Sequence, residues 1–204
     1  MTAPAVYLAS KSPRREELLR QLGIDFASLR LRESSARERD IVEGAHDAEP
    51  PRHYVERIAR TKATIGWQRM LQRGLPPRPV LGADTEVVLN DTIFGKPQDA
   101  TDAIRMLTLL SGRTHHVLTA IALTWEQNTA AEISTSAVTF RALARDEIER
   151  YVATSEPFDK AGAYAIQGRA ATFVQRIDGS YSGIMGLPLY ETASALAGIG
   201  FPVL

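Results

Sequence analysis

Residues Pro79 to Pro97 read PVLGADTEVVLNDTIFGKP, a strand-like pattern in which three polar residues interrupt apolar ones. A buried strand rarely carries two carboxylates unless they are paired or bind a metal. Because side chains alternate along a strand, Asp84 and Glu86 share one face, about 6.6 Å apart, and Thr85 takes the other. This spacing lets two carboxylates serve one metal–phosphate site. The alternative interpretation is an edge strand whose polar residues face water.

A hairpin is predicted to follow this strand. Asn90 and Asp91 suit a two-residue turn, and Thr92 to Phe94 form the returning strand. Lys96 comes directly after the return. The hairpin therefore brings a lysine back towards the carboxylates.

Length, charge and cysteine content narrow the class of protein. The chain has 204 residues, enough for one domain or two closely joined lobes, and 24 basic residues balance 24 acidic ones. This balance gives no general attraction to nucleic acid or membrane. The absence of cysteine excludes disulfides and thiolate metal sites. With no signal-like N-terminus and no apolar run of about 18 residues, we expect a cytoplasmic protein that binds neither nucleic acid nor membrane.

The beginning of the chain predicts a phosphate-binding loop. Val6 to Ala9 forms a short apolar strand, and Ser12 suits a helix N-cap with Pro13 at the first helical position. Arg14 and Arg15 then fall in the first turn, where each opposes the helix dipole at a cost of roughly 0.3–1 kcal/mol. A phosphate docked at the helix N-terminus would make the two arginines favourable instead of costly. The alternative is that both arginines face water or cap a neighbouring carboxylate.

A long helix is predicted from Pro51 to Arg73, with an apolar stripe that includes Val55 and Ala59. Lys62 lies seven residues after Val55, on the same stripe. An inward-facing lysine either snorkels along its stem or meets a buried anion. If that anion is a phosphate of the substrate, Lys62→Met should leave thermal stability nearly unchanged.

Helices and strands alternate along the rest of the chain, which predicts a mixed α/β fold with a cleft. Further strands are predicted at Ile24–Leu31, Arg113–Leu123, Ala131–Phe140 and Phe173–Ile177, with the second and third joined across Gln127 and Asn128. Further helices are predicted from Pro13 to Gly23, from an N-cap at Asp99 to Gly112, and at Arg145–Ala153 and Leu187–Ala197. Loops are predicted at residues 32–50, 155–162 and 179–183. His115 and His116 point to opposite faces of a strand, so we interpret them as surface or structural residues.

Four separated segments resemble the Maf family of nucleoside triphosphate pyrophosphatases in order and spacing. They are LASKSPRREELL (Leu8–Leu19), ARTKA (Ala59–Ala63), GADTEVVLNDTIFGKP (Gly82–Pro97) and EPFDKAGAYAIQG (Glu156–Gly168). SGRTHHVLTAIAL (Ser111–Leu123) and GSYSGIMGLPLYET (Gly179–Thr192) also match, so the resemblance covers nearly the whole chain. It implies a single domain over residues 1–204, with a mixed twisted sheet, flanking helices and two lobes around a central cleft. It also implies hydrolysis of a nucleotide between its α- and β-phosphates.

The resemblance carries over to particular residues. Asp84 matches the catalytic carboxylate that accepts the proton of the attacking water. The positions that match polar site residues are Ser10, Arg14, Arg15, Lys62, Lys96 and Lys160, and those associated with substrate choice are Arg14, Thr85 and Gln167. The IQG segment ending at Gly168 resembles the dTTP/UTP branch, whereas the 7-methyl-GTP branch carries a Ser-Glu pair near this point. Glu86 departs from the family's apolar residue, and Glu33 is the best match for a further acidic residue.

The expected chemistry requires fixed cations, a base for water and a divalent metal. With no cysteine and no histidine cluster, Mg²⁺ or Mn²⁺ is favoured, with Asp84 and Glu33 as the expected ligands. No GxSxG nucleophile motif is present. The expected substrates are dTTP, UTP and modified pyrimidine nucleotides, with a link to nucleotide-pool sanitation or division arrest. The alternatives are a 7-methyl-GTP pyrophosphatase and a non-enzymatic nucleotide-binding regulator of septation, and a homodimer is favoured by resemblance alone.

Overall fold

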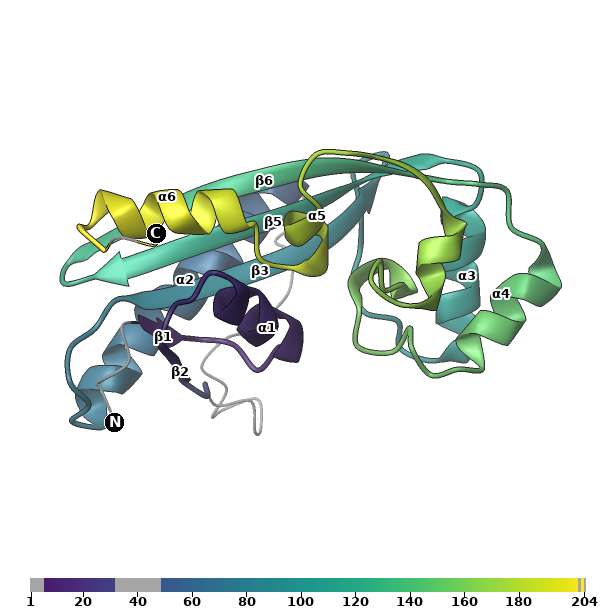
Figure 1. Cartoon of the computed structure of the whole chain (residues 1–204). Helices are drawn as coiled ribbons and strands as arrows, with labels where there is room; N and C mark the ends of the chain where they lie inside the picture. Colours follow the sequence, from purple (N-terminus) through teal and green to yellow (C-terminus); the bar gives the residue numbers. More distant parts are fainter. Residues whose placement is uncertain (1–5, 32–48, 202, 204) are drawn as a thin grey trace.

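The fold is a mixed α/β arrangement around one twisted sheet, seen in a computed structural model that describes residues 6–31, 49–201 and 203 (Figure 1). The strands are β1 (Val6–Leu8), β2 (Phe26–Ser28), β3 (Val80–Leu89), β4 (Thr92–Phe94), β5 (Thr114–Trp125), β6 (Asn128–Phe140) and β7 (Val174–Asp178). The helices are α1 (Pro13–Gln21), α2 (Pro51–Gln72), α3 (Ala100–Leu110), α4 (Arg145–Val152), α5 (Tyr181–Met185) and α6 (Leu189–Gly198). Two short 3₁₀ helices are η1 (Ala161–Ala163) and η2 (Arg169–Phe173). Glu33 and most of the predicted loop at 32–50 lie outside the described residues.

The sheet has the strand order β2-β1-β3-β5-β6-β7, with β4 paired to β3. β1 runs parallel to both β2 and β3, whereas the long β3–β5–β6 ladder is antiparallel. The β3–β4 hairpin turns at Asn90 and Asp91, both with positive φ, as the sequence predicts. The edge-strand interpretation of β3 is wrong, because β3 pairs with β5 along nearly its whole length and with β1 and β4 on its other side.

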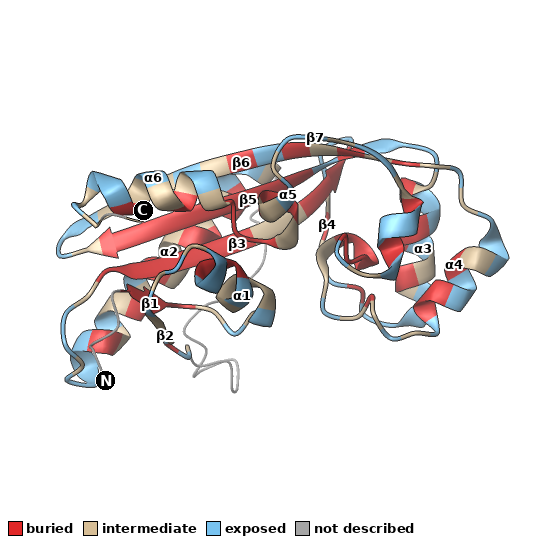
Figure 2. Ribbon diagram, in the orientation of Figure 1, coloured by how far each residue is buried: buried red, intermediate tan, exposed pale blue. Residues whose placement is uncertain are grey.

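The two faces of the sheet are covered by different helices (Figure 1). α2 packs on one face through Val55, Ala59 and Ala63, against Val88 and Leu118 among others. On the other face, α1 and α6 pack against β1, β3 and β5, and their contacting residues include Leu18, Leu19, Leu81, Ile121 and Leu196. The buried residues therefore concentrate along the central strands, while the outer faces of the helices are exposed (Figure 2).

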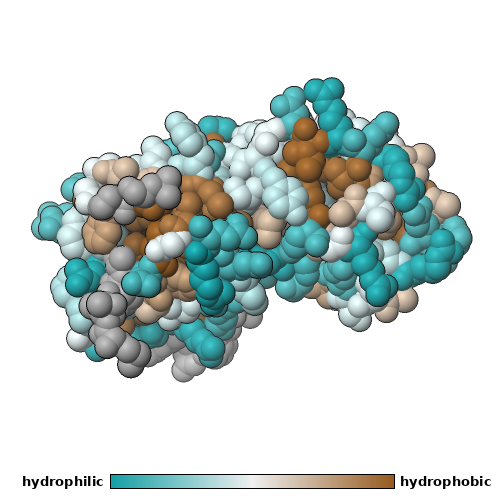
Figure 3. Space-filling model, viewed as in Figure 1, coloured by the Kyte–Doolittle hydropathy of each residue, from teal (hydrophilic) through white to brown (hydrophobic). Residues whose placement is uncertain are grey.

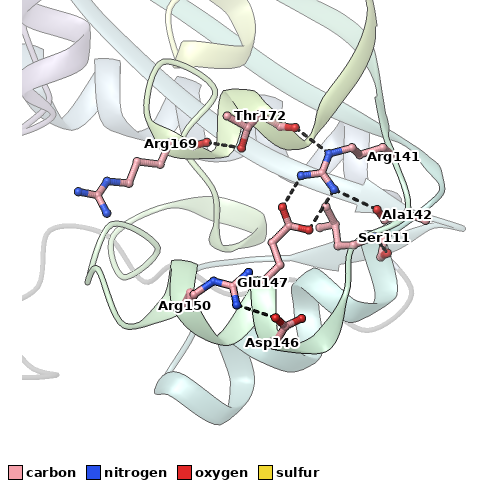
Figure 4. Close-up of polar contacts among 9 residues, drawn as sticks. Ser111, Arg141, Ala142, Asp146, Glu147, Arg150, Arg169 and Thr172 are labelled. Atoms are coloured by element: carbon pink, nitrogen blue, oxygen red, sulfur yellow. Dashed lines mark hydrogen bonds and ion pairs between the residues drawn. The ribbon is translucent and has the colours of Figure 1, made fainter.

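The molecule has two lobes, because β3, β5 and β6 extend beyond the helices that cover them at one end (Figure 1). The sheet lobe contains β1, β2, α1, α2 and α6. The α3–α4 lobe contains α3, α4, η1 and η2, and its core includes Phe94, Leu107, Phe140, Ile148 and Phe173. Figure 4 shows a polar cluster in this lobe, in which Arg141 bonds the Thr172 carbonyl and pairs with Glu147.

Several predicted elements need correction. The second strand is Phe26–Ser28 instead of Ile24–Leu31, because its parallel partner β1 is only three residues long. β5 and β6 extend to a tight turn at Glu126 and Gln127, one residue earlier than predicted, since Trp125 pairs with Asn128. The predicted loop at 179–183 is wrong, because Tyr181–Met185 is a short helix capped by Ser180, whose hydroxyl accepts from Gly183 N at 3.0 Å. The other α-helices and strands begin and end within two residues of the predicted positions, such as α6 at Leu189. The 3₁₀ helices η1 and η2 were not predicted, and η1 begins at Ala161, inside the loop predicted at 155–162.

Two helix N-caps were predicted, and they differ in outcome. Asp99 caps α3 as expected, because its carboxylate accepts from Asp102 N at 2.8 Å. Ser12 occupies the N-cap position of α1, but its side chain makes no capping hydrogen bond there. Ser12 instead lies at the cleft between the two lobes of the molecule, and its backbone N donates to Ser10 Oγ at 3.1 Å.

Hydrophilic residues dominate the face of the molecule drawn in Figure 3, and apolar residues gather only in limited areas of it. Among the described residues, the large hydrophobic side chains that are exposed are Leu71, Leu109, Tyr181 and Tyr190. No helix in the described ranges is both long and apolar enough to cross a membrane.

Candidate active site

A cleft of about 760 Å³ lies between the two lobes. Its walls come from the β1–α1 loop and the start of α1, from α2, from the middle of β3, from the segment after the β3–β4 hairpin, and from residues 159–161, 164–167 and 184–186. All nine described residues to which the sequence assigned a site role line this cleft: Ser10, Arg14, Arg15, Lys62, Asp84, Thr85, Lys96, Lys160 and Gln167. Their roles remain predictions, and Glu33 lies outside the described residues.

The cleft opens where β3 changes its neighbour. On one side of β3, Val80 and Leu81 pair with β1, and Val87 to Leu89 pair with β4. Between them, no strand in the described part of the chain pairs with residues 82–86 on this side. The polar interruption of the strand therefore coincides with the stretch that borders the cleft.

Asp84 and Lys62 form a close ion pair at one wall of the cleft. Lys62 Nζ donates to Asp84 Oδ1 at 2.7 Å, and the two side chains keep only 14% and 10% of their exposure. Of the two alternatives for Lys62, contact with a buried anion is correct, and that anion is a carboxylate of the protein. The second oxygen, Asp84 Oδ2, is buried and accepts no hydrogen bond from the part of the chain that the structure describes.

Gly82 brings the helix that carries Lys62 close to the strand that carries Asp84. A Cβ atom at Gly82 would lie 2.5 Å from the Ala59 carbonyl oxygen and 2.6 Å from Ala63 N, so a larger residue cannot be accommodated without a shift. The sequence interpretation did not single out Gly82. An isolated glycine inside a strand, which often marks a close backbone approach, is the signal that could have found it.

Thr85 points to the opposite face of β3 from Asp84, as the alternation of side chains predicts. Arg15 donates through Nη2 to Thr85 Oγ1 at 3.1 Å and through Nε to the Gly186 carbonyl at 2.8 Å. Arg15 Nη1 also reaches Ser10 Oγ at 3.3 Å. Arg15 thus joins the β1–α1 loop, β3 and the end of α5, which makes it a structural tie in the cleft wall.

Arg14 and Lys160 meet at one carboxylate across the cleft. Arg14 Nη1 donates to Asp159 Oδ2 at 3.3 Å, and Lys160 Nζ bonds Asp159 Oδ1 and the Glu156 carbonyl. Burial opposes the ionisation of Asp159, but these two cations hold its pKa below the usual value. Arg14 comes from the sheet lobe and Asp159 from the α3–α4 lobe, so this contact connects the two lobes.

Lys96, Gln167 and Glu86 also line the cleft. Lys96 and Gln167 are exposed, as expected for side chains that reach a ligand rather than the core. Glu86 is half-buried and lies on the same face of β3 as Asp84, in agreement with the predicted alternation.

The two neighbouring histidines behave as structural and surface residues. His115 is fully buried, and its Nε2 lies 2.9 Å from Tyr164 Oη, whereas His116 is exposed. Burial lowers the pKa of His115 to about 4, with a smaller effect from His116. His115 therefore packs as a neutral ring against Phe140 and Tyr164.

The described residues offer little that could bind a metal without a substrate. No cluster of three or more His, Cys, Asp or Glu side chains with metal-binding geometry occurs among them. Asp84 nevertheless fits as a single ligand, because its Oδ2 is buried at the cleft wall and accepts no hydrogen bond from described residues. A hard cation commonly takes one or two carboxylates from the protein and further oxygens from substrate phosphates and water.

Comparison with known proteins identifies the family. The family model described as Maf-like protein matches residues 5–199. The dTTP/UTP pyrophosphatase of Aromatoleum aromaticum is 55% identical over 199 residues, which cover 97% of each chain. The dTTP/UTP pyrophosphatase of Nitrosospira multiformis is 56% identical, over 94% of this chain and 92% of its own. That of Nitrosomonas europaea is 51% identical over 100% of both chains. The chain therefore belongs to the Maf family.

Proposed function

We propose that the chain is a nucleoside triphosphate pyrophosphatase that hydrolyses dTTP and UTP to the nucleoside monophosphate and pyrophosphate. The observation that carries the proposal is the buried carboxylate of Asp84 in a cleft that cationic side chains also line. Those cations are Arg14, Arg15, Lys62, Lys96 and Lys160, from four segments of the chain. The names and the 51–56% identity of the three relatives support the same activity.

Asp84 acts as the general base for the attacking water. Lys62 donates to Oδ1 at 2.7 Å and so holds the carboxylate at the cleft wall, where it takes the proton of the attacking water. Because proton transfer needs a fixed distance between base and water, the Lys62 contact orients the carboxylate as well as balancing its charge. A protein that only bound nucleotides would not need a buried carboxylate beside the phosphates.

The cations stabilise the negative charge that develops on the phosphates and on the leaving pyrophosphate. Arg14 and Lys160 both contact Asp159, and phosphate oxygens are acceptors of the same kind as a carboxylate. Both side chains therefore turn from Asp159 to the triphosphate when it binds. Lys96 reaches the phosphates from the segment after the hairpin, and Arg15 shapes the wall through Thr85.

A divalent ion, Mg²⁺ or Mn²⁺, belongs to this reaction. When bound, it neutralises phosphate charge and polarises the phosphoryl group. Asp84 is the ligand that the described residues supply, and Glu33 is the second expected ligand.

Gln167 reads the pyrimidine base. Its amide has both a donor and an acceptor, which complement an N–H flanked by carbonyls on uracil and thymine. Modified pyrimidines that keep this edge are substrates for the same reason, and their removal links the activity to nucleotide-pool sanitation or division arrest. Residues 1–204 act as one domain, since β3, β5 and β6 run through both lobes, and a homodimer remains the predicted assembly.

The test is kcat/KM for dTTP, UTP, CTP, GTP and 7-methyl-GTP, measured by pyrophosphate release with Mg²⁺. We expect dTTP and UTP to be preferred, and Gln167→Glu to reduce that preference before it changes the metal requirement. A preference for 7-methyl-GTP would refute the substrate assignment while keeping the reaction. Nucleotide binding without pyrophosphate release would instead support a non-enzymatic regulator.

A further inference from the structure

A turn in the α3–α4 lobe presents Gln167 to the cleft. Gly168 N donates to the Ala165 carbonyl at 3.0 Å, which closes the turn. Ile166 is buried in the core of the lobe, whereas Gln167 is exposed and lines the cleft. The direction of the Gln167 amide therefore depends on how firmly this turn is held.

Glu156 holds both ends of the turn. Its Oε2 accepts from Arg169 N at 3.2 Å, and its Oε1 accepts from the Tyr151 hydroxyl at 2.9 Å. The Tyr151 oxygen in turn accepts from Ala165 N at 3.3 Å. Burial of Tyr151 and its bond to Glu156 raise the pKa of the phenol, so it remains protonated and continues to donate. One carboxylate therefore fixes the backbone before and after Gln167.

The contact is close enough to exclude a side chain on the turn. A Cβ atom at Gly168 would lie 2.3 Å from Glu156 Oε1 and 2.5 Å from its Cδ. The carboxylate thus packs directly on the backbone of the turn. Among the described residues that line the cleft, Gln167 is present and Glu156 is not, so Glu156 acts from behind.

We propose that Glu156 is a positioning residue for base recognition, which fixes the turn from Ala165 to Arg169 so that Gln167 meets the pyrimidine. The inference rests on the proposed function, because it assumes that Gln167 reads the base. The backbone carbonyl of Glu156 has a separate contact, since it accepts from Lys160 Nζ at 2.9 Å. Any substitution keeps that carbonyl, so loss of the carboxylate should alter base selection more than phosphate binding.

The test measures kcat and KM for dTTP, UTP, CTP and GTP in the wild type, Glu156→Ala, Glu156→Gln and Tyr151→Phe. We expect Glu156→Ala to lower the ratio of kcat/KM for dTTP to that for CTP by about 10–100-fold, mainly through KM, because small misplacements of a binding group have effects of this size. Glu156→Gln keeps one acceptor, and Tyr151→Phe keeps the contact of Glu156 with Arg169 N. Both variants should therefore lower the dTTP to CTP ratio by less than Glu156→Ala does.

Glu147→Gln is the matched control. Glu147 lies on α4 and pairs with Arg141, which bonds the Thr172 carbonyl at 2.9 Å and so supports the opposite end of η2 (Figure 4). The control therefore removes a carboxylate from the same lobe without touching the Gln167 turn. We expect it to lower the thermal midpoint while the dTTP to CTP ratio stays at the wild-type value.

The outcomes separate this inference from the proposed function. A wild type with no preference for dTTP and UTP over CTP and GTP would refute both. If the wild type has that preference but a folded Glu156→Ala or Tyr151→Phe variant keeps the wild-type ratio of kcat/KM for dTTP to that for CTP, the role of Glu156 alone would be overturned. An equal loss of selectivity in Glu147→Gln would also overturn it, because general loosening of the lobe would then be the cause. If Glu156→Ala does not fold, Glu156→Gln and Tyr151→Phe provide the same comparison.

Discussion

The pair of Lys62 and Asp84 can be tested by removing each charge alone and then both together. The variants are Lys62→Met, Asp84→Asn and the double variant. If Lys62 faced only substrate phosphate, Lys62→Met would hardly change stability. Because Lys62 Nζ lies 2.7 Å from Asp84 Oδ1, the structure reverses that expectation: Lys62→Met leaves a carboxylate at the cleft wall without its cation.

The expected loss of unfolding free energy follows from the burial of the Lys62–Asp84 pair. Removal of one partner from a fully buried ion pair costs about 3–5 kcal/mol. These side chains keep 14% and 10% of their exposure and face a cleft, so we expect Lys62→Met to cost about 3 kcal/mol, the lower end of that range. Asp84→Asn keeps an acceptor for Lys62 and should cost about 1 kcal/mol. The double variant leaves neither charge unpaired. Its loss of stability should therefore be smaller than the sum of the two single losses, by a coupling free energy of about 1–3 kcal/mol.

The assay combines denaturant unfolding of the four proteins with pyrophosphate release from dTTP at saturating Mg²⁺. The m-values must agree among the variants for the free energies of unfolding to be compared. Turnover by Asp84→Asn should fall by about 10²-fold or more, the contribution of a general base. Additive stability changes would refute the pairing as an energetic unit, and near-normal turnover of a folded Asp84→Asn protein would refute the catalytic role.

Three further predictions follow from single features. Gly82→Ala should destabilise the fold by about 1–3 kcal/mol and lower turnover, since its Cβ would push α2 and Lys62 away from β3; equal unfolding midpoints for the variant and the wild type would contradict this. Burial lowers the pKa of His115 to about 4 from 6.5, so stability should be full above pH 6.5 and fall by about 2 kcal/mol between pH 7 and 5, as the unfolded chain takes the proton. His115→Gln should remove this slope and His116→Gln should keep it, and a slope that survives His115→Gln would contradict the assignment. Chelation of divalent ions should abolish turnover and Mn²⁺ should restore it, with Mn²⁺ binding followed by electron paramagnetic resonance; unchanged Mn²⁺ affinity in Asp84→Asn would exclude Asp84 as a ligand.

The parts of the fold that the sequence predicts well are those with local rules. The cap of α3 needs only Asp99 and the amide of Asp102, which lie three positions apart in the chain. The same rule applies to Ser180 and Gly183, but the surrounding Gly and Ser residues favoured a loop, so α5 was missed. Strand ends were less predictable, because β2 stops where its partner β1 stops, and strand partners are not encoded locally.

The composition of the site was more predictable than its contacts. Alternation along β3 places Asp84 and Thr85 on opposite faces, and the structure agrees. By contrast, Arg14 and Asp159 are 145 positions apart, and no spacing rule relates them. The roles of Glu156 and Tyr151 were missed for a similar reason, since their function depends on a turn that begins at Ala165.

The Lys62–Asp84 contact shows how two local patterns become one site. On β3, Gly82 and Asp84 share a face and are one pleat apart, so the missing side chain of Gly82 lies beside the carboxylate. On α2, the atoms closest to Gly82 come from Ala59 and Ala63, with Lys62 Cβ at 3.1 Å from the same point. The close approach that glycine permits therefore sets Lys62 directly over the next inward residue of the strand, which is Asp84. Each pattern is visible in the sequence, but only the packing of α2 on β3 joins them, and a variant that separates the two elements should lose the pair before it loses either element.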